Sequence, residues 1–185
     1  MDFQITDIPG YTLVELITIL AIVSILLTIA IPGFQWLSAR TRISTSVNLF
    51  LSHLYQARSE AVNREQVIAL CPSTDGRLCV ADYRQWADGY IVFVDGDRNR
   101  QRNADEQVLR YFQGESNSII IRTSSAARQT LAYLPTGRAW NSNTSIRFCA
   151  HNHDESNRAL IIASTGRPRL SRTLPDGSKI LCARP

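Results

Sequence analysis

Apolar residues run almost without interruption from Tyr11 to Phe34, and Glu15 is the only charged residue among them. A helix over this stretch would be about 36 Å long at a rise of about 1.5 Å per residue, enough to cross a hydrocarbon core of about 30 Å. A carboxylate near the apolar end is costly in lipid unless it is paired. At the other end, Pro32-Gly33 removes a helix hydrogen bond and weakens the turn. The pattern predicts a helix of transmembrane length with two unusual positions.

Beyond Gly33 the apolar positions recur at spacings of three and four, which is typical of one side of an amphipathic helix. This stripe consists of Ile43, Val47, Phe50, Leu54, Ala57 and Ala61. We therefore predict a single helix over residues 11–66, kinked near Pro32. Its first part, residues 11–34, suits a membrane, and its second part is expected to pack on a globular domain.

After Gln66 the pattern changes to short β-type runs separated by Gly, Pro, Asp and Asn. The candidate strands are residues 67–71, 90–94, 107–112, 119–122, 130–134, 146–149, 159–163, 169–172 and 180–182. The predicted fold class is α+β, with a long N-terminal helix packed on a mostly antiparallel β-rich domain over residues 67–185.

The four cysteines, Cys71, Cys79, Cys149 and Cys182, allow three disulfide pairings. No Cys-x-x-Cys pair occurs, which disfavours a zinc site. Two disulfides formed in an oxidising compartment are the better explanation. We favour Cys71–Cys79, which closes a local loop, and Cys149–Cys182, which ties a late strand to the C-terminus.

The N-terminal residues carry a family resemblance. Gly10-Tyr11-Thr12-Leu13-Val14-Glu15, followed by Ala30-Ile31-Pro32-Gly33-Phe34, resembles the prepilin signal and N-terminal helix of type IV pilins. The resemblance implies that residues 1–10 are a leader, which a prepilin peptidase removes between Gly10 and Tyr11 before methylating the new N-terminus of Tyr11. It also implies that residues 11–34 lie in the filament core after assembly and that Glu15 pairs with the terminal amine of a neighbouring pilin subunit in the filament.

By the same resemblance, the chain is held in inner-membrane lipid as a single-pass protein with a periplasmic C-terminal domain, and it later joins a pilus on the cell surface. The charges point the other way, because the leader has no Lys or Arg whereas Arg40 and Arg42 follow the apolar run. The cysteines and the prepilin junction outweigh this charge pattern. A conventional secretory signal is the alternative, but the leader is acidic and no convincing Ala-x-Ala site follows.

Four later motifs resemble the GspH/FimT-type minor pilins and pseudopilins. They are Cys71-Pro72-Ser73, residues 86–95, Leu134-Pro135-Thr136-Gly137-Arg138 and Gly166-Arg167-Pro168-Arg169. The chain most resembles FimT minor pilins, which capture DNA in natural transformation through a Gly-Arg-x-Arg element. This implies DNA binding without sequence preference. The alternative is a structural minor pilin that primes pilus assembly, or a type II secretion pseudopilin.

The residues themselves suit phosphate binding. Of the 20 basic residues 19 are arginines and the formal net charge is +4, although a solvated Arg-rich surface explains the composition equally well. In a strand, Arg167 and Arg169 point to one face, and Pro168 stiffens the backbone between them. Paired guanidiniums suit a nucleic-acid backbone. The candidate DNA-binding residues are Gly166, Arg167, Arg169, Arg172 and Lys179, with Arg138, Arg147 and Arg158 as further candidates.

A second polar cluster resembles a calcium loop. Asp95, Asp97, Asn99 and Glu106 match its positions 1, 3, 5 and 12. However, position 6 is Arg100 where the loop needs Gly, and a strand rather than a helix precedes it. We therefore favour a polar turn between two strands and expect no metal site here.

Other chemistry finds little support in the sequence. His151-Asn152-His153-Asp154-Glu155 reads as an exposed loop rather than a metal site. No nucleophile has a recognisable base partner, and no glycine-rich phosphate loop occurs. The sequence predicts a protein that is not an enzyme and has no cofactor.

Overall fold

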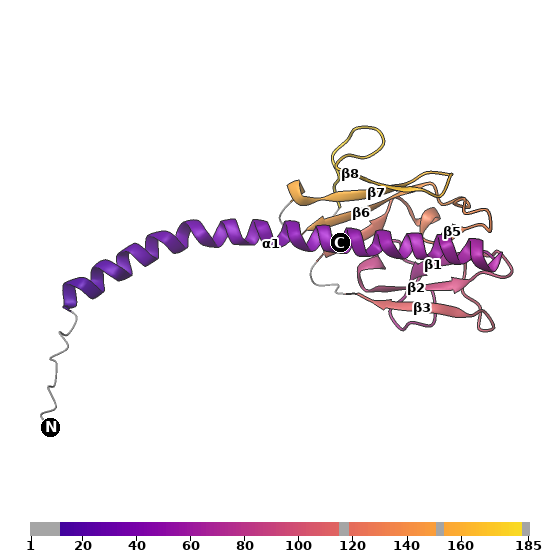
Figure 1. Cartoon of the computed structure of the whole chain (residues 1–185), viewed down its shortest axis with the longest axis horizontal. Helices are drawn as coiled ribbons and strands as arrows, with labels where there is room; N and C mark the ends of the chain where they lie inside the picture. Colours follow the sequence, from indigo (N-terminus) through magenta and orange to yellow (C-terminus); the bar gives the residue numbers. More distant parts are fainter. Residues whose placement is uncertain (1–11, 115–118, 151–153, 183–185) are drawn as a thin grey trace, which may run out of the picture. The chain divides into compact units, whose positions relative to one another are not determined.

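The computed structural model describes residues 12–114, 119–150 and 154–182. Helix α1, Leu13–Arg64, contains 52 residues and contributes to two compact units, Met1–Ser38 and Ala39–Pro185 (Figure 1). The helix continues through Pro32-Gly33 and ends where Glu65 adopts a left-handed backbone conformation with φ of 55°. The predicted fold class, α+β with a long N-terminal helix and antiparallel sheets, is confirmed.

The described part of the first unit has an apolar and exposed surface. Its large apolar side chains are between 41% and 74% exposed, from Trp36 to Leu13. The hydroxyls of Thr18, Ser24 and Thr28 donate to backbone carbonyls one turn earlier, so they are satisfied within the helix. By length and composition α1 could cross a membrane. Such a surface requires apolar surroundings, such as lipid or other apolar helices.

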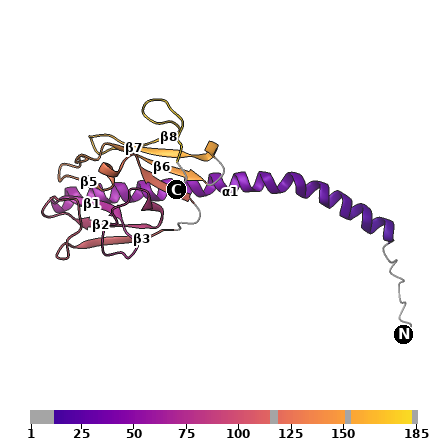
Figure 2. The same cartoon turned by 180° about the vertical axis from the view of Figure 1, so that it is seen from behind.

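The second unit contains two four-stranded antiparallel sheets. In sheet A the strand order is β3-β2-β1-β5, with β1 Ile68–Pro72, β2 Gly89–Val94, β3 Val108–Gln113 and β5 Leu131–Tyr133. In sheet B the order is β4-β6-β7-β8, with β4 Ile119–Thr123, β6 Thr144–Ala150, β7 Arg158–Ile162 and β8 Pro168–Ser171. Short 3-10 turns occur at Gln85–Ala87, Ala126–Arg128 and Asp154–Ser156. Both sheets lie on the same side of the second half of α1, which is in front of them in Figure 1 and behind them in Figure 2.

The core forms between this half of α1 and the two sheets. All six residues of the predicted apolar stripe are at most 1% exposed. Phe50 lies at the centre, with its ring centroid 5.5 Å from that of Trp86, 4.9 Å from that of Tyr90 and 5.6 Å from that of Phe148. These rings come from the helix and from segments of both sheets, so one helical side chain joins the two sheets.

The two disulfides lie on the outer faces of the sheets. Cys71–Cys79 and Cys149–Cys182 are bonded in the structure, and these are the two pairings that we favoured from the sequence. The prediction of a strand over residues 180–182 is wrong. This segment instead crosses the outer side of sheet B, where Ile180 is buried beside Cys149 and its carbonyl accepts a 2.9 Å hydrogen bond from Asn157 Nδ2.

Candidate nucleic-acid interface

Strand β8 forms an edge of sheet B and carries the arginine pair. Pro168 lies opposite the core residue Ile162 and is itself buried. Arg169 lies opposite Ile161 on the other face of the sheet, and both Arg167 and Arg169 are exposed. Arg167 directly precedes β8, and its carbonyl accepts a 3.5 Å hydrogen bond from the Ala163 N–H, which continues the pairing with β7. Because side chains alternate along a strand, this places Arg167 and Arg169 on the outer face of sheet B, which is the face turned away from α1.

Gly166 sets the turn that precedes this pair. Its φ is +79°, and its backbone N–H donates a 2.9 Å hydrogen bond to the carbonyl of Ala163. A Cβ at this position would lie far inside van der Waals contact with the carbonyl oxygen of Gly137. Gly166 is buried, so its contribution is to let two turns meet rather than to offer a contact surface.

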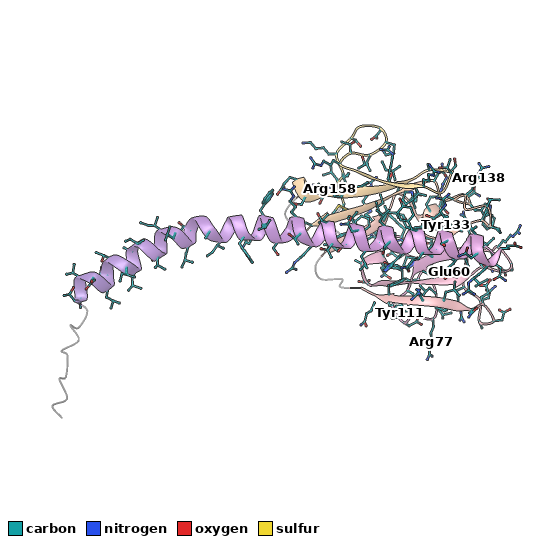
Figure 3. All side chains as sticks on the ribbon, viewed as in Figure 1. Glu60, Arg77, Tyr111, Tyr133, Arg138 and Arg158 are labelled. Atoms are coloured by element: carbon teal, nitrogen blue, oxygen red, sulfur yellow. A yellow bond between two sulfur atoms is a disulfide. The ribbon has the colours of Figure 1, made fainter. Side chains whose placement is uncertain are left out.

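The second of these turns, residues 134–138, brings a third arginine to the same place. Gly137 N–H donates to Leu134 O at 2.8 Å, and Arg58 Nε on α1 donates to Gly137 O at 2.8 Å. Arg138 follows directly and is exposed, at the end of sheet B where the β7–β8 connection lies (Figure 3). We call Arg138, Arg167 and Arg169 the hairpin-end arginines. Among the residues that the structure describes, none of the three takes part in an ion pair.

The other predicted basic residues lie elsewhere. Arg172 follows the far end of β8, about 16–17 Å from Arg167 at about 3.3 Å per strand residue. Lys179 pairs with Thr173 in an isolated bridge. Both line a groove of about 340 Å³ that also contains Arg158 and the acidic residues Asp154 and Glu155. The structure thus divides the predicted set between the two ends of β8.

Two further candidates for DNA binding, Arg147 and Arg158, lie close to other positive charges, and Arg147 also donates a hydrogen bond within the chain. Arg147 Nη1 donates to Leu181 O at 3.0 Å and holds the C-terminal segment on the outer face of sheet B. Burial lowers the pKa of Arg147, and the positive charge of Arg122 lowers it further. Burial also lowers the pKa of Arg158, with smaller effects from Arg172 and Arg40. Several positive charges therefore lie together at the Arg158 end of the sheet.

The N-terminal site residues are only partly described. Gly10 and Tyr11 lie outside the described residues, as do His151 and His153 of the histidine cluster. Glu15 is exposed in the first turn of α1, where its backbone N–H donates to Thr12 Oγ1 at 3.3 Å. Its carboxylate has no hydrogen bond or ion pair to the described residues.

Comparison with known families identifies the class of protein. Residues 46–166, more than half of the chain, match the family model of type II transport protein GspH. The chain belongs to this family. This GspH-family chain is 26% identical over 165 residues to the pilin-like protein PilA1 of Thermus thermophilus, a match covering 87% of this chain and 97% of the relative.

A solved structure supports the fold. The type IV minor pilin FimU of Pseudomonas aeruginosa superposes with a TM-score of 0.52 over 71% of this chain and 90% of that chain, at 21% identity. The chain is a type IV minor pilin or pseudopilin, as the resemblance in the sequence implied. This family and this fold point to a structural protein, and the pilin family suggests contacts with other pilin subunits.

Proposed function

We propose that this minor pilin binds extracellular DNA through Arg167 and Arg169 and promotes DNA uptake in natural transformation. The observation that carries the proposal is a pair of exposed guanidiniums on one face of an edge strand, with no carboxylate partner among the described residues. Arg138 adds a third positive charge from the adjacent turn.

The chemistry of the site favours phosphate over bases. A guanidinium forms two parallel hydrogen bonds to a phosphate, and Pro168 limits the backbone freedom lost on binding. The site consists of strand and turn residues and has no helix of a kind that reads a groove, so the contacts carry no sequence information. We expect affinities of about 10⁻⁴ to 10⁻⁶ M that fall steeply with salt. Several subunits or filaments acting together would raise the effective affinity.

The same proposal covers how the chain is processed and assembled into a filament. Residues 1–10 are removed as a leader by a prepilin peptidase, Tyr11 becomes the methylated N-terminus, and the segment 11–34 resides in inner-membrane lipid until assembly. Glu15 then pairs with the terminal amine of a neighbouring subunit. This is supported by the exposed apolar side chains around Glu15 and by the absence of a partner for its carboxylate within the described chain.

The test is a DNA-binding titration with the full chain in detergent micelles across a salt series, followed by fluorescence anisotropy of labelled duplex and single-stranded DNA. The double variant Arg167→Gln/Arg169→Gln should lose about tenfold or more in affinity and show a shallower salt dependence. The matched control is Arg77→Gln/Arg110→Gln, which removes the same charge from exposed residues of the sheet A side, where Figure 3 places Arg77 far from Arg138.

The outcomes separate the possibilities. An equal loss in both double variants would mean that net charge, not this site, determines binding. A loss in Arg172→Gln/Lys179→Gln as large as in the first variant would extend the site along the whole of β8. If the wild type binds no DNA even at low salt, the DNA proposal is wrong, and a purely structural role in assembly is the function that stands.

A further inference from the structure

The connection between β2 and β3 brings three carboxylates together. Asp95 directly follows β2, Asp97 lies two residues later, and Glu106 comes just before β3. One carboxylate oxygen from each lies within 4.8 Å of the other two. Like charges at this distance repel one another, so the cluster is costly unless a positive charge compensates it.

Asp95 provides a second, independent observation that points to cation binding at this cluster. The residue is 0% exposed. Its Oδ2 accepts a 3.2 Å hydrogen bond from the backbone N–H of Arg100, but its Oδ1 has no hydrogen-bond partner among the described residues. A buried carboxylate oxygen without a partner is strongly unfavourable. Burial raises the pKa of Asp95, backbone N–H groups of Arg100 and Asn99 partly oppose this shift, and the negative charges of Glu106 and Asp97 add to it.

The nearby arginines direct their guanidinium hydrogen bonds away from the three carboxylates, although the charge of Asp95 acts on Arg100. The Arg100 guanidinium donates to the carbonyl of Trp140 and lies 5.0 Å from the centroid of its ring. Arg102 donates to the backbone carbonyls of Glu106 and Ala104 instead of to a carboxylate. Over the described residues, none of the three carboxylates forms an ion pair.

The loop also holds the two outer carboxylates in position. Glu106 accepts hydrogen bonds from the backbone N–H groups of Gly96 at 2.7 Å and Asn103 at 2.8 Å. Asp97 Oδ2 accepts hydrogen bonds from the side-chain amides of Asn99 at 2.8 Å and Asn103 at 2.7 Å. Each carboxylate retains free lone pairs, because its two oxygens together offer about four acceptor positions.

We propose that Asp95, Asp97 and Glu106 bind one calcium ion. All three ligands are hard oxygen donors, which Ca²⁺ prefers at about 2.3–2.6 Å, so opposite ligands of one ion lie about 4.6–5.2 Å apart. The three oxygens lie within 4.8 Å of one another, as ligands of one ion must. Bound Ca²⁺ would pair with Asp95 Oδ1 and cancel the repulsion among the carboxylates, while water would fill the remaining coordination positions.

Arg100, which stands at position 6 where a calcium loop needs Gly, has the backbone conformation that this position requires. Position 6 of a calcium loop needs Gly because the chain turns sharply there. Arg100 occupies that position with φ of 65°, in the left-handed region that Gly favours. Its guanidinium contacts on Trp140 hold this conformation.

The position of the site determines what the ion stabilises. The backbone N–H of Asp95 donates a 2.9 Å hydrogen bond to Val67 O, in the segment between α1 and β1. Through Arg100 the same loop contacts Trp140, which follows β5. A calcium ion at Asp95 therefore reinforces the junction of the helix end with sheet A. This inference does not depend on the DNA-binding proposal.

The experiment uses the full chain in detergent micelles after removal of metal with EDTA. Calcium binding is measured by equilibrium dialysis with ⁴⁵Ca²⁺ and by the change in Tm. We expect one ion per chain and a rise in Tm of about 3–6 °C when calcium exceeds its Kd about tenfold. Asp97→Asn and Glu106→Gln should each weaken binding about tenfold or more, because ligand charge sets affinity. The control Asp105→Asn removes an exposed carboxylate next to Glu106 and should leave Kd within about twofold.

Three results would overturn the proposal. The first is a folded wild-type chain with no saturable calcium binding and no change in Tm up to millimolar calcium. The second is an equal loss of affinity in Asp105→Asn, which would indicate diffuse charge attraction. The third is an equal rise in Tm with Mg²⁺, which would remove the assignment to calcium.

Discussion

Replacing Gly166 by Ala tests the contact that unites the hairpin-end arginines. Gly166 and Gly177 occupy the same kind of turn, in which the glycine N–H donates to the carbonyl three residues earlier, at 2.9 Å and 3.0 Å. Their φ angles are also alike, at 79° and 82°. A Cβ on Gly177 would meet no atom within 4 Å, whereas a Cβ on Gly166 would overlap Gly137 O and lie 3.1 Å from Ala139 N. Gly177→Ala is therefore a matched control.

The magnitudes follow from these surroundings. A left-handed Ala costs about 1–2 kcal/mol, and this is the whole expected effect of Gly177→Ala. Gly166→Ala carries the same cost plus about 1–3 kcal/mol for the overlap, because Gly137 is fixed by its own turn and by Arg58 and cannot move away cheaply. At about 2–4 °C per kcal/mol, Tm should fall by about 2–8 °C in Gly177→Ala and by about 4–20 °C in Gly166→Ala.

Thermal unfolding of the full chain in micelles, followed by near-ultraviolet circular dichroism, measures both variants, and a DNA titration below Tm completes the test. Gly166→Ala should also weaken DNA binding, since the overlap displaces Arg167 from Arg138, while Gly177→Ala should not. Equal Tm values for the two variants would refute the reasoning, because the close approach of the two turns would then contribute nothing to stability.

Two further predictions concern titrating groups. Because burial raises the pKa of Asp95, its ionised form destabilises the calcium-free fold as pH rises above the ordinary pKa of 3.8. Asp95→Asn should therefore raise Tm in EDTA at pH 7. It should also abolish the rise in Tm caused by calcium. A lower Tm in EDTA would contradict this. Burial and the charge of Arg110 lower the pKa of His53, so stability should fall as pH drops below 6.5, by at most about 1.4 kcal/mol per pH unit. His53→Gln, which keeps a polar partner for Tyr90, should flatten the dependence of Tm on pH between 7.5 and 5.5, and an unchanged slope would contradict this.

The helix and most strands were predictable because burial imposes a regular period on the sequence. The stripe from Ile43 to Ala61 repeats every three to four residues and is buried in the structure. The strand predicted over residues 180–182 does not form. These residues are apolar and resemble a strand, but Ile180 is buried by crossing sheet B, and the Cys149–Cys182 bond holds the segment there without a ladder of backbone hydrogen bonds.

The candidate sites were predictable only where the signal is local. The spacing of Arg167 and Arg169 gave their common face, since a strand alternates with a period of two. No local pattern could place Arg138 beside them. That proximity depends on a contact between Gly137, in the β5–β6 connection, and Gly166, in the β7–β8 connection. Likewise, the carboxylate pattern from Asp95 to Glu106 was visible, but the left-handed conformation of Arg100 depends on the distant residue Trp140.

The edge position of β8 has a consequence for solubility. An edge strand offers free backbone groups to any other strand, and identical chains at high local concentration are the most frequent partners. Here Pro168 has no N–H to offer, and Arg167 and Arg169 beside it repel the same edge of a second copy. The arginines that we propose to bind DNA thus also prevent strand-to-strand aggregation. Neutralising both should therefore make the protein more prone to self-association.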